Sequence, residues 1–480
     1  MNRERHPLLG EIILARQVTT SQMAPKRVRT IILLLSGSVA LMMTGYGLVM
    51  PVFARRLSEF GGGVEELGLM TMAFALAQLI GAPFMGGQAD QRGRRPIILL
   101  SLVSVAFSYI GYLLAPSTAI FIAVRAAAGF LTSGLFPAAM GVVADLVSED
   151  HRARWAGIVM GSYAVGMIFG PVIGGVLYDG FGFAAPFVLS AVVALMALIA
   201  GASMIPETRT VEIRNREMLR RRHANPQQTG RASIWDALPR PLLIFGTLLA
   251  VDFISAFSFA FVEPQMIFYF YDSLGWSTTQ FGVLVGVYGL ATVLGQVGLG
   301  QLSDRWGRKP LIIAGLIPNM VFFGGLAVLT NYAAMMVGAA FAGIGNALIA
   351  PAANAFYLDI TAEEHRSRII GLKGSFLSLG GVLGPLAVAA VSGLMAPQNV
   401  FWIACALVLV ALVLGALFLK EQKHLVADPR NLPDPASIQR ALAAQAGLHN
   451  IVTVAASARA ERQLGQGRRQ RSASVGSWHR

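Results

Sequence analysis

Twelve apolar runs, each long enough to cross a bilayer, constrain this 480-residue sequence more than any other feature. A bilayer core needs about 20 apolar residues in a helix. Hydrophobic residues make up 55% of the chain, above the roughly 45–50% of soluble domains. We therefore predict an all-α polytopic membrane protein. The twelve expected transmembrane helices are residues 29–50, 66–88, 96–115, 118–146, 154–178, 183–204, 241–270, 278–302, 310–330, 333–359, 367–393 and 398–419.

The basic residues follow the expected topology of such a chain. Arg125 and Lys373 fall well inside expected helices, Arg29, Arg154 and Arg368 stand at the start of three of them, and Arg55 and Arg56 fall in an odd-numbered loop. Every other Lys or Arg lies in the N-terminal arm, an even-numbered loop or the C-terminal tail. This positive-inside pattern predicts that both termini are cytoplasmic. Because topology accounts for the net charge of +13, we expect no nucleic-acid partner.

The segments outside the apolar runs are basic and carry no recognisable module. We expect a cytoplasmic arm at 1–28, a cytoplasmic connector at 205–240, and a tail at 420–480 that is disordered or lies partly on the membrane surface. No removable signal peptide is evident at the N-terminus. The single cysteine, Cys405, excludes a disulfide within the chain and a multi-cysteine metal site. We expect no metal and no cofactor.

An internal repeat divides the chain into two halves. The stretch GGQADQRGRRPIILL at 86–100 returns as GQLSDRWGRKPLIIA at 300–314, so that Asp90 and Asp304 lie 214 residues apart. In the first helix of each half the offset becomes 213, which relates Pro51 to Pro264. We predict two parallel six-helix pseudo-repeats, 29–204 and 241–419, with a cavity between them that opens to either side. The offset of 214 also relates Gly93 to Gly307, Arg94 to Arg308, Asp145 to Asp359, Arg152 to Arg366, Gly129 to Gly343 and Pro171 to Pro385.

The repeated loop resembles a motif of the major facilitator superfamily, G-x-L-A-D-[RK]-x-G-R-[RK], and the resemblance covers about residues 29–419. The first copy departs from it at Gln88 and Gln91. The resemblance implies a gating loop that holds the outward-facing state through an Asp packed against the other half. Positive-inside selection alone would explain the arginines, but not the repeated Gly and Asp. The implied gating residues are Gly86, Asp90, Gly93, Arg94, Asp145, Arg152, Gly300, Asp304, Gly307 and Arg308.

Two further motifs match the family. Arg125 with Gly129 resembles its R-x-x-x-G element, which implies either proton coupling or a hydrogen bond to a neighbouring backbone. A buried arginine must face a partner or water, because it costs at least about 2.5–3.5 kcal/mol in lipid. GSYAVGMIFGPVIGG at 161–175 resembles the fifth-helix element of the antiporters, although small residues at this spacing also serve helix packing. Its residues are Gly166, Gly170, Pro171, Gly174 and Gly175.

Acidic residues inside the expected helices are the candidates for proton coupling. Asp252 lies about 16 Å along the seventh helix, close to the bilayer midplane, and is either a proton carrier or neutralised by a partner such as Arg125. Glu263 precedes Pro264 nearer the outer face, where it is a rim or kink residue or a cation site. Pro264 either kinks this helix or marks where it leaves the membrane. We expect Lys373 to snorkel to the cytoplasm.

Family analogy places the first, fourth, seventh and tenth helices around the cavity, which makes Tyr46, Phe136, Phe257 and Asn354 candidate lining residues. Such a lining suits lipophilic, often cationic compounds. The chain resembles twelve-span bacterial drug:proton antiporters. We therefore expect a monomeric inner-membrane transporter that exports small amphipathic or drug-like compounds in exchange for protons.

A proton symporter or facilitator for a sugar or another small metabolite is the alternative. This alternative is favoured if the fifth-helix glycines serve only helix packing and if the cavity is more polar than expected. An enzyme is disfavoured because the sequence has no H-E-x-x-H motif and no Cys/His ligand set. An ATP-driven pump is disfavoured because no G-x-x-x-x-G-K-[ST] loop is present.

Overall fold

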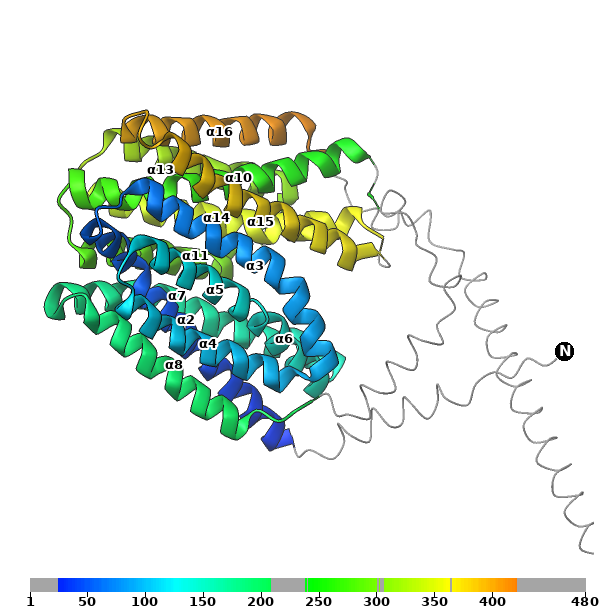
Figure 1. Ribbon diagram of the computed structural model, residues 1–480. Helices are drawn as coiled ribbons and strands as arrows, with labels where there is room; N and C mark the ends of the chain where they lie inside the picture. Colours follow the sequence, from blue (N-terminus) through cyan, green and yellow to red (C-terminus); the bar gives the residue numbers. More distant parts are fainter. Residues whose placement is uncertain are drawn as a thin grey trace, which may run out of the picture. The chain divides into compact units, whose positions relative to one another are not determined.

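The computed structural model describes residues 25–208, 238–239, 241–299, 302, 306–362 and 365–420. The expected arm, connector and tail lie largely outside these residues, as do the gating candidates Gly300 and Asp304. Within the described part of the chain all regular structure is helical (Figure 1). Among the described residues, twelve helices have the length and hydropathy to cross a membrane, as predicted.

The helices follow the twelve expected runs closely. The first half contains α2 (Pro25–Glu59), α3 (Val64–Arg92), α4 (Arg94–Leu114), α5 (Thr118–Thr132), α6 (Leu135–Leu146), α7 (Glu149–Phe181) and α8 (Ala184–Met204). The second half contains α10 (Leu242–Phe268), the π-turn η2 (Tyr269–Ser273), α11 (Thr278–Leu299), α13 (Arg308–Val328), α14 (Tyr332–Ile360), α15 (Arg366–Val391) and α16 (Pro397–Phe418).

Three helices differ in detail from the expectation. The first extends beyond residue 50 to Glu59, and the fourth is divided into α5 and α6 by a turn at 133–134. The seventh continues through Pro264, so this proline does not end the helix. The helix ends instead in the π-turn Tyr269–Ser273, a local geometry that often accompanies functional sites.

The pseudo-repeat extends to individual helix contacts. A Cβ added at Gly129 would meet the backbone oxygen of Phe74, and one added at Gly343 would meet that of Tyr288, which preserves the offset of 214 at both members of the pair. Gly93 and Gly307 both adopt positive φ, 112° and 91°, at the start of α4 and α13. These positions favour glycine because a side chain strains this backbone conformation. The contacts confirm two parallel six-helix halves.

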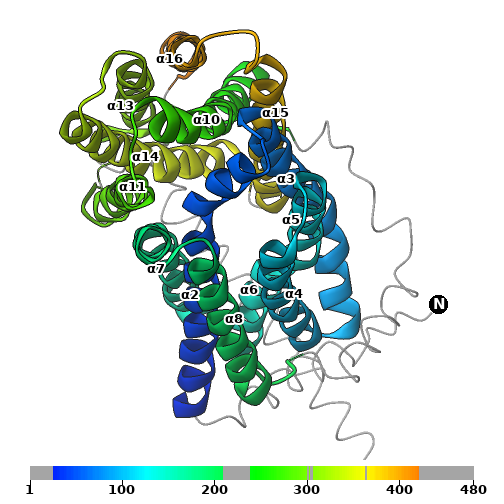
Figure 2. The same ribbon diagram turned by 60° about the vertical axis from the view of Figure 1, so that its left-hand side comes forward.

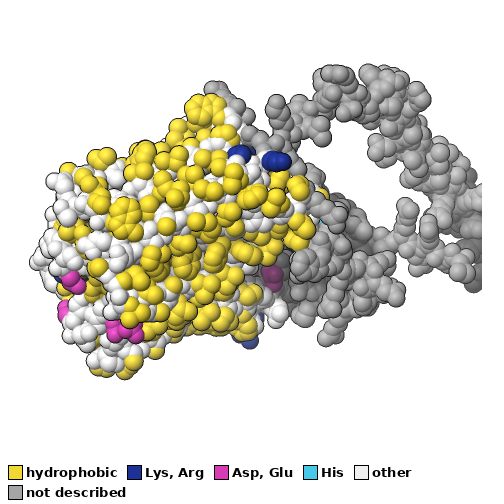
Figure 3. Space-filling view, turned by 90° about the horizontal axis from the view of Figure 1, so that it is seen from above, with side chains coloured by type: hydrophobic (Ala, Val, Ile, Leu, Met, Phe, Trp, Pro, Cys, Tyr) yellow, Lys and Arg dark blue, Asp and Glu magenta, His cyan; other side chains and the backbone are white. Residues whose placement is uncertain are grey.

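The two ends of the bundle carry opposite charge. We call one the acidic end, because its side chains include Glu59, Glu65, Glu66, Asp179 and Asp272. The other, which we call the basic end, includes Arg92, Arg94, Arg95, Arg152, Arg154, Arg308, Lys309, Arg366 and Arg368. Figure 3 shows acidic side chains grouped at its left end and an apolar flank between the ends. Large apolar side chains of the bundle are strongly exposed, for example Val297 at 81%, as expected for a surface that faces lipid.

The halves contact each other mainly through two helix pairs, α7 with α11 and α3 with α15 (Figure 2). Toward the acidic end both pairs are tight. A Cβ added at Gly68 would lie 2.7 Å from the backbone oxygen of Pro385, and one at Gly175 would lie 2.6 Å from that of Thr278. These contacts leave no room for a side chain larger than hydrogen.

Toward the basic end several glycines of the same four helices have open space. A Cβ added at any of these positions would meet no atom of the described residues within 4 Å. The tight contacts of Gly68 and Gly175 with the other half therefore have no counterpart at these glycines. The glycines concerned are Gly86 and Gly87 of α3, Gly157 and Gly161 of α7, Gly298 of α11, and Gly371 and Gly374 of α15.

Candidate functional site

Ion pairs at the basic end repeat between the halves. Arg94 Nε lies 2.7 Å from Asp145 Oδ2, and Arg308 Nε lies 3.0 Å from Asp359 Oδ2, with both partners related by the offset of 214. Each pair joins two helices of one half. The gating candidates Arg94 and Asp145 are thus brought together, and the second half reproduces their geometry.

Neighbouring basic residues donate hydrogen bonds to backbone oxygens at helix ends. Arg95 donates to the backbone oxygen of Ala202 at 2.6 Å, and its repeat mate Lys309 donates to that of Ala416 at 2.7 Å. Arg152 donates to the backbone oxygen of Val147 at 3.2 Å. These contacts fix the helix ends next to the repeated loops.

Two residues in this region were missed by the sequence analysis. The Arg94 guanidinium lies in the space that a Cβ of Gly141 would fill. Glu207 accepts hydrogen bonds from the backbone N–H groups of Arg94 and Arg95, at 3.1 and 3.2 Å, where the start of α4 favours a negative charge. Neither residue belongs to a local motif, since both act through helices that are distant in sequence.

Asp90 and Gly86 are the remaining described members of the predicted gate. Asp90 is half-buried near the end of α3, and Gly86 has open space at its Cβ position. The packing of Asp90 against the other half stays a prediction.

Arg125 lies in an aromatic cage in the first half. Its Nη2 donates to Tyr46 Oη at 2.8 Å, and its Cζ lies 3.9, 4.8 and 4.9 Å from the ring centres of Phe74, Phe53 and Tyr46. Cation–π contacts stabilise a guanidinium that lipid would not solvate. Tyr46 was predicted to line the cavity, and the structure shows that it holds Arg125.

Asp252 pairs with Lys373 in the second half. The side chains of Asp252 and Lys373 are 8% and 9% exposed, and Lys373 Nζ lies 3.7 Å from Asp252 Oδ2. The expectation that Lys373 snorkels to the cytoplasm was wrong, because Asp252 and Asn354 retain its ammonium inside the helix bundle. Lys373 Nζ donates to Asn354 Oδ1 at 2.6 Å and lies 5.1 Å from the centre of the Tyr357 ring.

Lys373 links a proton-coupling candidate to a cavity-lining candidate. Asp252 was expected to carry protons and Asn354 to line the cavity, and Lys373 bridges them. Lys373, rather than Arg125, is the cation beside Asp252. Because Asn354 is exposed, it connects the buried ion pair to accessible space.

Glu263 is partly buried in α10. Its role as a rim residue, a kink residue or a cation site stays a prediction.

The fifth-helix motif packs on two sides. Cβ atoms at Gly166 and Gly170 would lie 2.6 Å from Met43 Cβ and 2.7 Å from Gly47 Cα, so this side of α7 fits against α2. Gly174 also packs on α2, where its Cβ would collide with the backbone of Leu48. On the other side, Gly175 and Pro171 meet α11 of the second half. The motif therefore connects packing within one half to packing between the halves.

The remaining cavity candidates lie in aromatic pairs. Phe136 is 41% exposed and meets Tyr163 at a centroid distance of 6.5 Å. Phe257 stacks on Phe261 at 5.7 Å. Their exposure to a cavity stays a prediction.

Hydrogen bonds between the halves at the acidic end were not predicted. Asp179 of α7 accepts from the backbone N–H groups of Thr278 and Thr279, at 3.2 and 2.7 Å, and so caps α11 of the other half. Arg55 donates to the backbone oxygen of Trp276 at 2.9 Å, and Tyr271 Oη donates to that of Pro51 at 2.7 Å. We call these four hydrogen bonds the acidic-end latch.

Comparison with known proteins decides the family. The sequence model described as Major Facilitator Superfamily matches residues 35–270 and 248–461. The chain belongs to this family. It is an integral membrane transporter of small molecules and not an enzyme, and the fold predicted from its sequence is confirmed.

Among its relatives are two resistance proteins. The chain is 30% identical to the class C tetracycline resistance protein of Escherichia coli over 75% of this chain and 89% of that protein. It is 25% identical to multidrug resistance protein 2 of Bacillus subtilis (strain 168), over 78% of this chain and 90% of that protein.

A solved structure shares the fold. A bacterial homologue of the human lysosomal transporter Spinster, in an inward-facing and occupied conformation, superposes with a TM-score of 0.66 and 15% identity. The alignment covers 82% of this chain and 97% of that one.

Proposed function

We propose that this protein is a proton-coupled antiporter that exports small amphipathic or drug-like compounds by alternating access. The buried Asp252–Lys373 pair carries the proposal, because a paired charge inside a membrane span is costly and usually functional. The named tetracycline and multidrug resistance relatives support the substrate class.

The Asp252–Lys373 pair can couple proton uptake to the release of a cationic compound. While Asp252 is ionised, its charge offsets that of Lys373. Once a proton neutralises Asp252, Lys373 carries an unbalanced positive charge, which disfavours a cationic compound beside Asn354. Proton uptake and cation binding therefore exclude each other electrostatically, which is the requirement for antiport.

Arg125 is a second candidate for the coupling, because its buried charge is already positioned by the Tyr46 hydroxyl and by the rings of Phe53 and Phe74.

We assign the basic end to the cytoplasm of a bacterial inner membrane, because its loops carry the positive charge that marks that side. The described conformation, packed at the acidic end and open around the glycines of the basic end, is then the one that takes up substrate from the cytoplasm. We expect the transporter to act as a monomer, with each half moving against the other.

The test is proton movement in inverted vesicles that contain the full chain. A pH-sensitive dye reports the acid interior while lipophilic cations, antibiotics and sugars are added in turn. We expect at least one amphipathic compound to discharge the gradient in wild type and not in Asp252→Asn. Discharge that is equal in both proteins would remove Asp252 from the coupling. Discharge by no compound would contradict antiport and favour the facilitator.

A further inference from the structure

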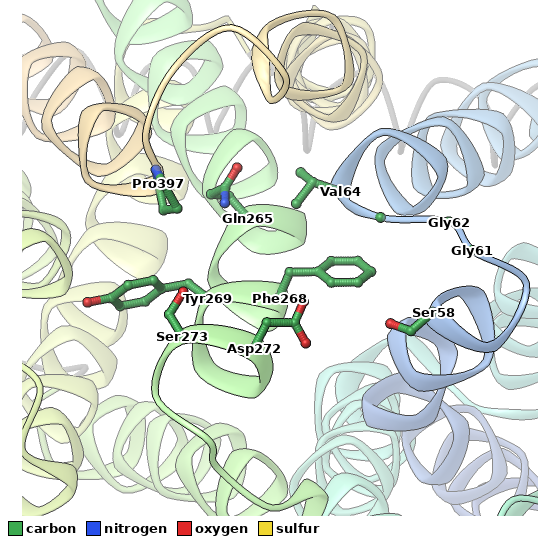
Figure 4. Close-up of a pocket in the computed structure, with 11 residues that line it drawn as sticks. Ser58, Gly61, Gly62, Val64, Gln265, Phe268, Tyr269, Asp272, Ser273 and Pro397 are labelled. Atoms are coloured by element: carbon green, nitrogen blue, oxygen red, sulfur yellow. The ribbon is translucent and has the colours of Figure 1, made fainter.

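A pocket at the acidic end lies apart from the Arg125 cage and the Asp252–Lys373 pair. It has a volume of about 450 Å³ and is lined by the loop between α2 and α3, the end of α10 with its π-turn, and the start of α16 (Figure 4). The loop contributes Gly61, Gly62 and Gly63, whose small size keeps the wall close to the backbone. Because the loop belongs to the first half and the π-turn to the second, the pocket depends on the contact between the halves.

Two polar side chains of the pocket, Asp272 and Gln265, have acceptor oxygens without a partner among the described residues. Asp272 is exposed in the π-turn, and no hydrogen bond or ion pair to another described residue is found for its carboxylate. Gln265 is 5% exposed, and its Oε1 has no hydrogen-bond partner among the described residues. Figure 4 shows its side chain reaching between Val64 and Pro397 toward the pocket. A buried amide oxygen without a donor is rare and calls for a donor from elsewhere.

The walls favour a ligand with an apolar body. Phe268 and Tyr269 line the pocket beside Asp272, and aromatic faces attract cations. No lysine or arginine of the described residues lines it, whereas Asp272 supplies one negative charge. One carboxylate, an amide group and aromatic walls together match a primary organic ammonium compound, since its N–H groups can bind Asp272 while its apolar part meets the rings.

We propose that this pocket is a second binding site, selective for primary organic ammonium compounds, whose occupancy holds the acidic end closed. The site is complete only while both halves meet there, so a ligand bound to it favours that conformation by its differential affinity. Occupancy therefore inhibits transport without competing at the Asp252 and Arg125 clusters. This last step rests on the alternating access proposed above, whereas the binding itself does not.

Binding is tested on the purified full chain, with benzylammonium as the probe and the shift in Tm as the readout. We expect a Tm that rises with probe concentration in wild type. The affinity should fall at least about tenfold in Asp272→Asn, because a hydrogen bond to a charged group is lost. Glu65→Gln is the matched control: it removes an exposed acid from the same end but not from the pocket, and it should bind as wild type does.

Two further measurements make the result decisive. Benzyltrimethylammonium keeps the charge but lacks N–H donors, so it should bind more weakly than benzylammonium. Asp179→Asn weakens the acidic-end latch without lining the pocket, so it should lower the apparent affinity if the closed end is required.

Equal binding to wild type and Asp272→Asn, or no binding to wild type, would overturn the site. Unchanged affinity in Asp179→Asn would overturn its dependence on conformation. Failure of proton exchange in vesicles would leave these binding results intact.

Discussion

Individual charged residues in this protein depart from the internal repeat where function is proposed. Arg125 corresponds to Ala339 and Lys373 to Val159 at the offset of 214, and Asp252 corresponds to Val39 at the offset of 213. All three counterparts are buried apolar residues. The fold of a half therefore does not require these charges, in contrast to the Arg94 pair, which both halves share.

The Asp252–Lys373 pair leads to a prediction about stability. Lys373→Met alone strands a carboxylate inside the bundle and should lower the free energy of unfolding by about 3–5 kcal/mol. The double variant Asp252→Asn with Lys373→Met leaves no unpaired charge and should recover most of that loss. Thermal unfolding of the purified proteins measures both effects. A double variant less stable than Lys373→Met would show that the pair is not an isolated unit.

The space beside Gly141 holds the Arg94 guanidinium, and a substitution there tests its importance. Gly141→Ala should displace the Arg94 guanidinium, separate it from Asp145 and reduce transport, because the new methyl group needs the volume that Arg94 fills. Gly246→Ala in α10 is the control, since its Cβ meets no described atom within 4 Å. Drug efflux from cells compares the variants at equal expression. Equal loss of efflux in both would contradict a specific role for the space beside Gly141.

Helix α7 makes contacts both within its own half and with the other half. It packs on α2 through Gly166 and Gly170, meets α11 through Gly175, and caps α11 through Asp179. A rigid helix with these contacts transmits movement from its own half to the interface between the halves. The antiporter-like motif therefore has a mechanical explanation that does not depend on binding substrate.

The contact of α11 with α7 predicts unequal effects of two alanine substitutions. A Cβ at Gly282 collides with the backbone oxygen of Pro171, so Gly282→Ala should cost about 1–3 kcal/mol of stability. Gly298→Ala in the same helix has free space and should be neutral or stabilising, since alanine favours helix by up to about 1 kcal/mol. Thermal unfolding of the two variants is the measurement. The opposite ranking would mean that the halves do not pack tightly at Gly282.

The cap of α11 by Asp179 predicts a smaller effect. Asp179→Ala removes acceptors from two backbone N–H groups and should cost about 0.5–2 kcal/mol. Because this cap joins the two halves, the variant should also exchange amide hydrogens faster at residues 278–281. Hydrogen exchange of the purified protein tests this. Unchanged protection there would show that the cap does not restrain the acidic end.

For the whole molecule, the fold could be predicted from the sequence because the bilayer dictates helix length and the repeat dictates parallel halves. Even the change of offset to 213 agrees with the packing, since α2 meets α7 at Gly47 and α10 meets α15 at Ala260, 213 residues later. Side-chain partners were harder to predict. Nothing in the local sequence pairs Lys373 with Asp252, or Asp179 with α11, because each pairing depends on how distant helices cross.

The proposed mechanism requires the two ends of the molecule to open in turn. Tight packing at Gly68 and Gly175 and free space at Gly157 and Gly298 describe one of the two states. In the other, the glycines of the basic end should meet across the interface, as those of the acidic end do here. A bulky residue at Gly161 should then block this second state while leaving the first intact.

Distances between spin labels measure this movement most directly. One pair joins Met204 to Leu417 at the basic end, where both side chains are exposed, and the other joins Gly180 to Ser273 at the acidic end, each pair linking the two halves. As pH is lowered in the presence of a transported compound, we predict that the first distance shortens while the second lengthens. Distances that both stay constant, or that change in the same direction, would contradict alternating access.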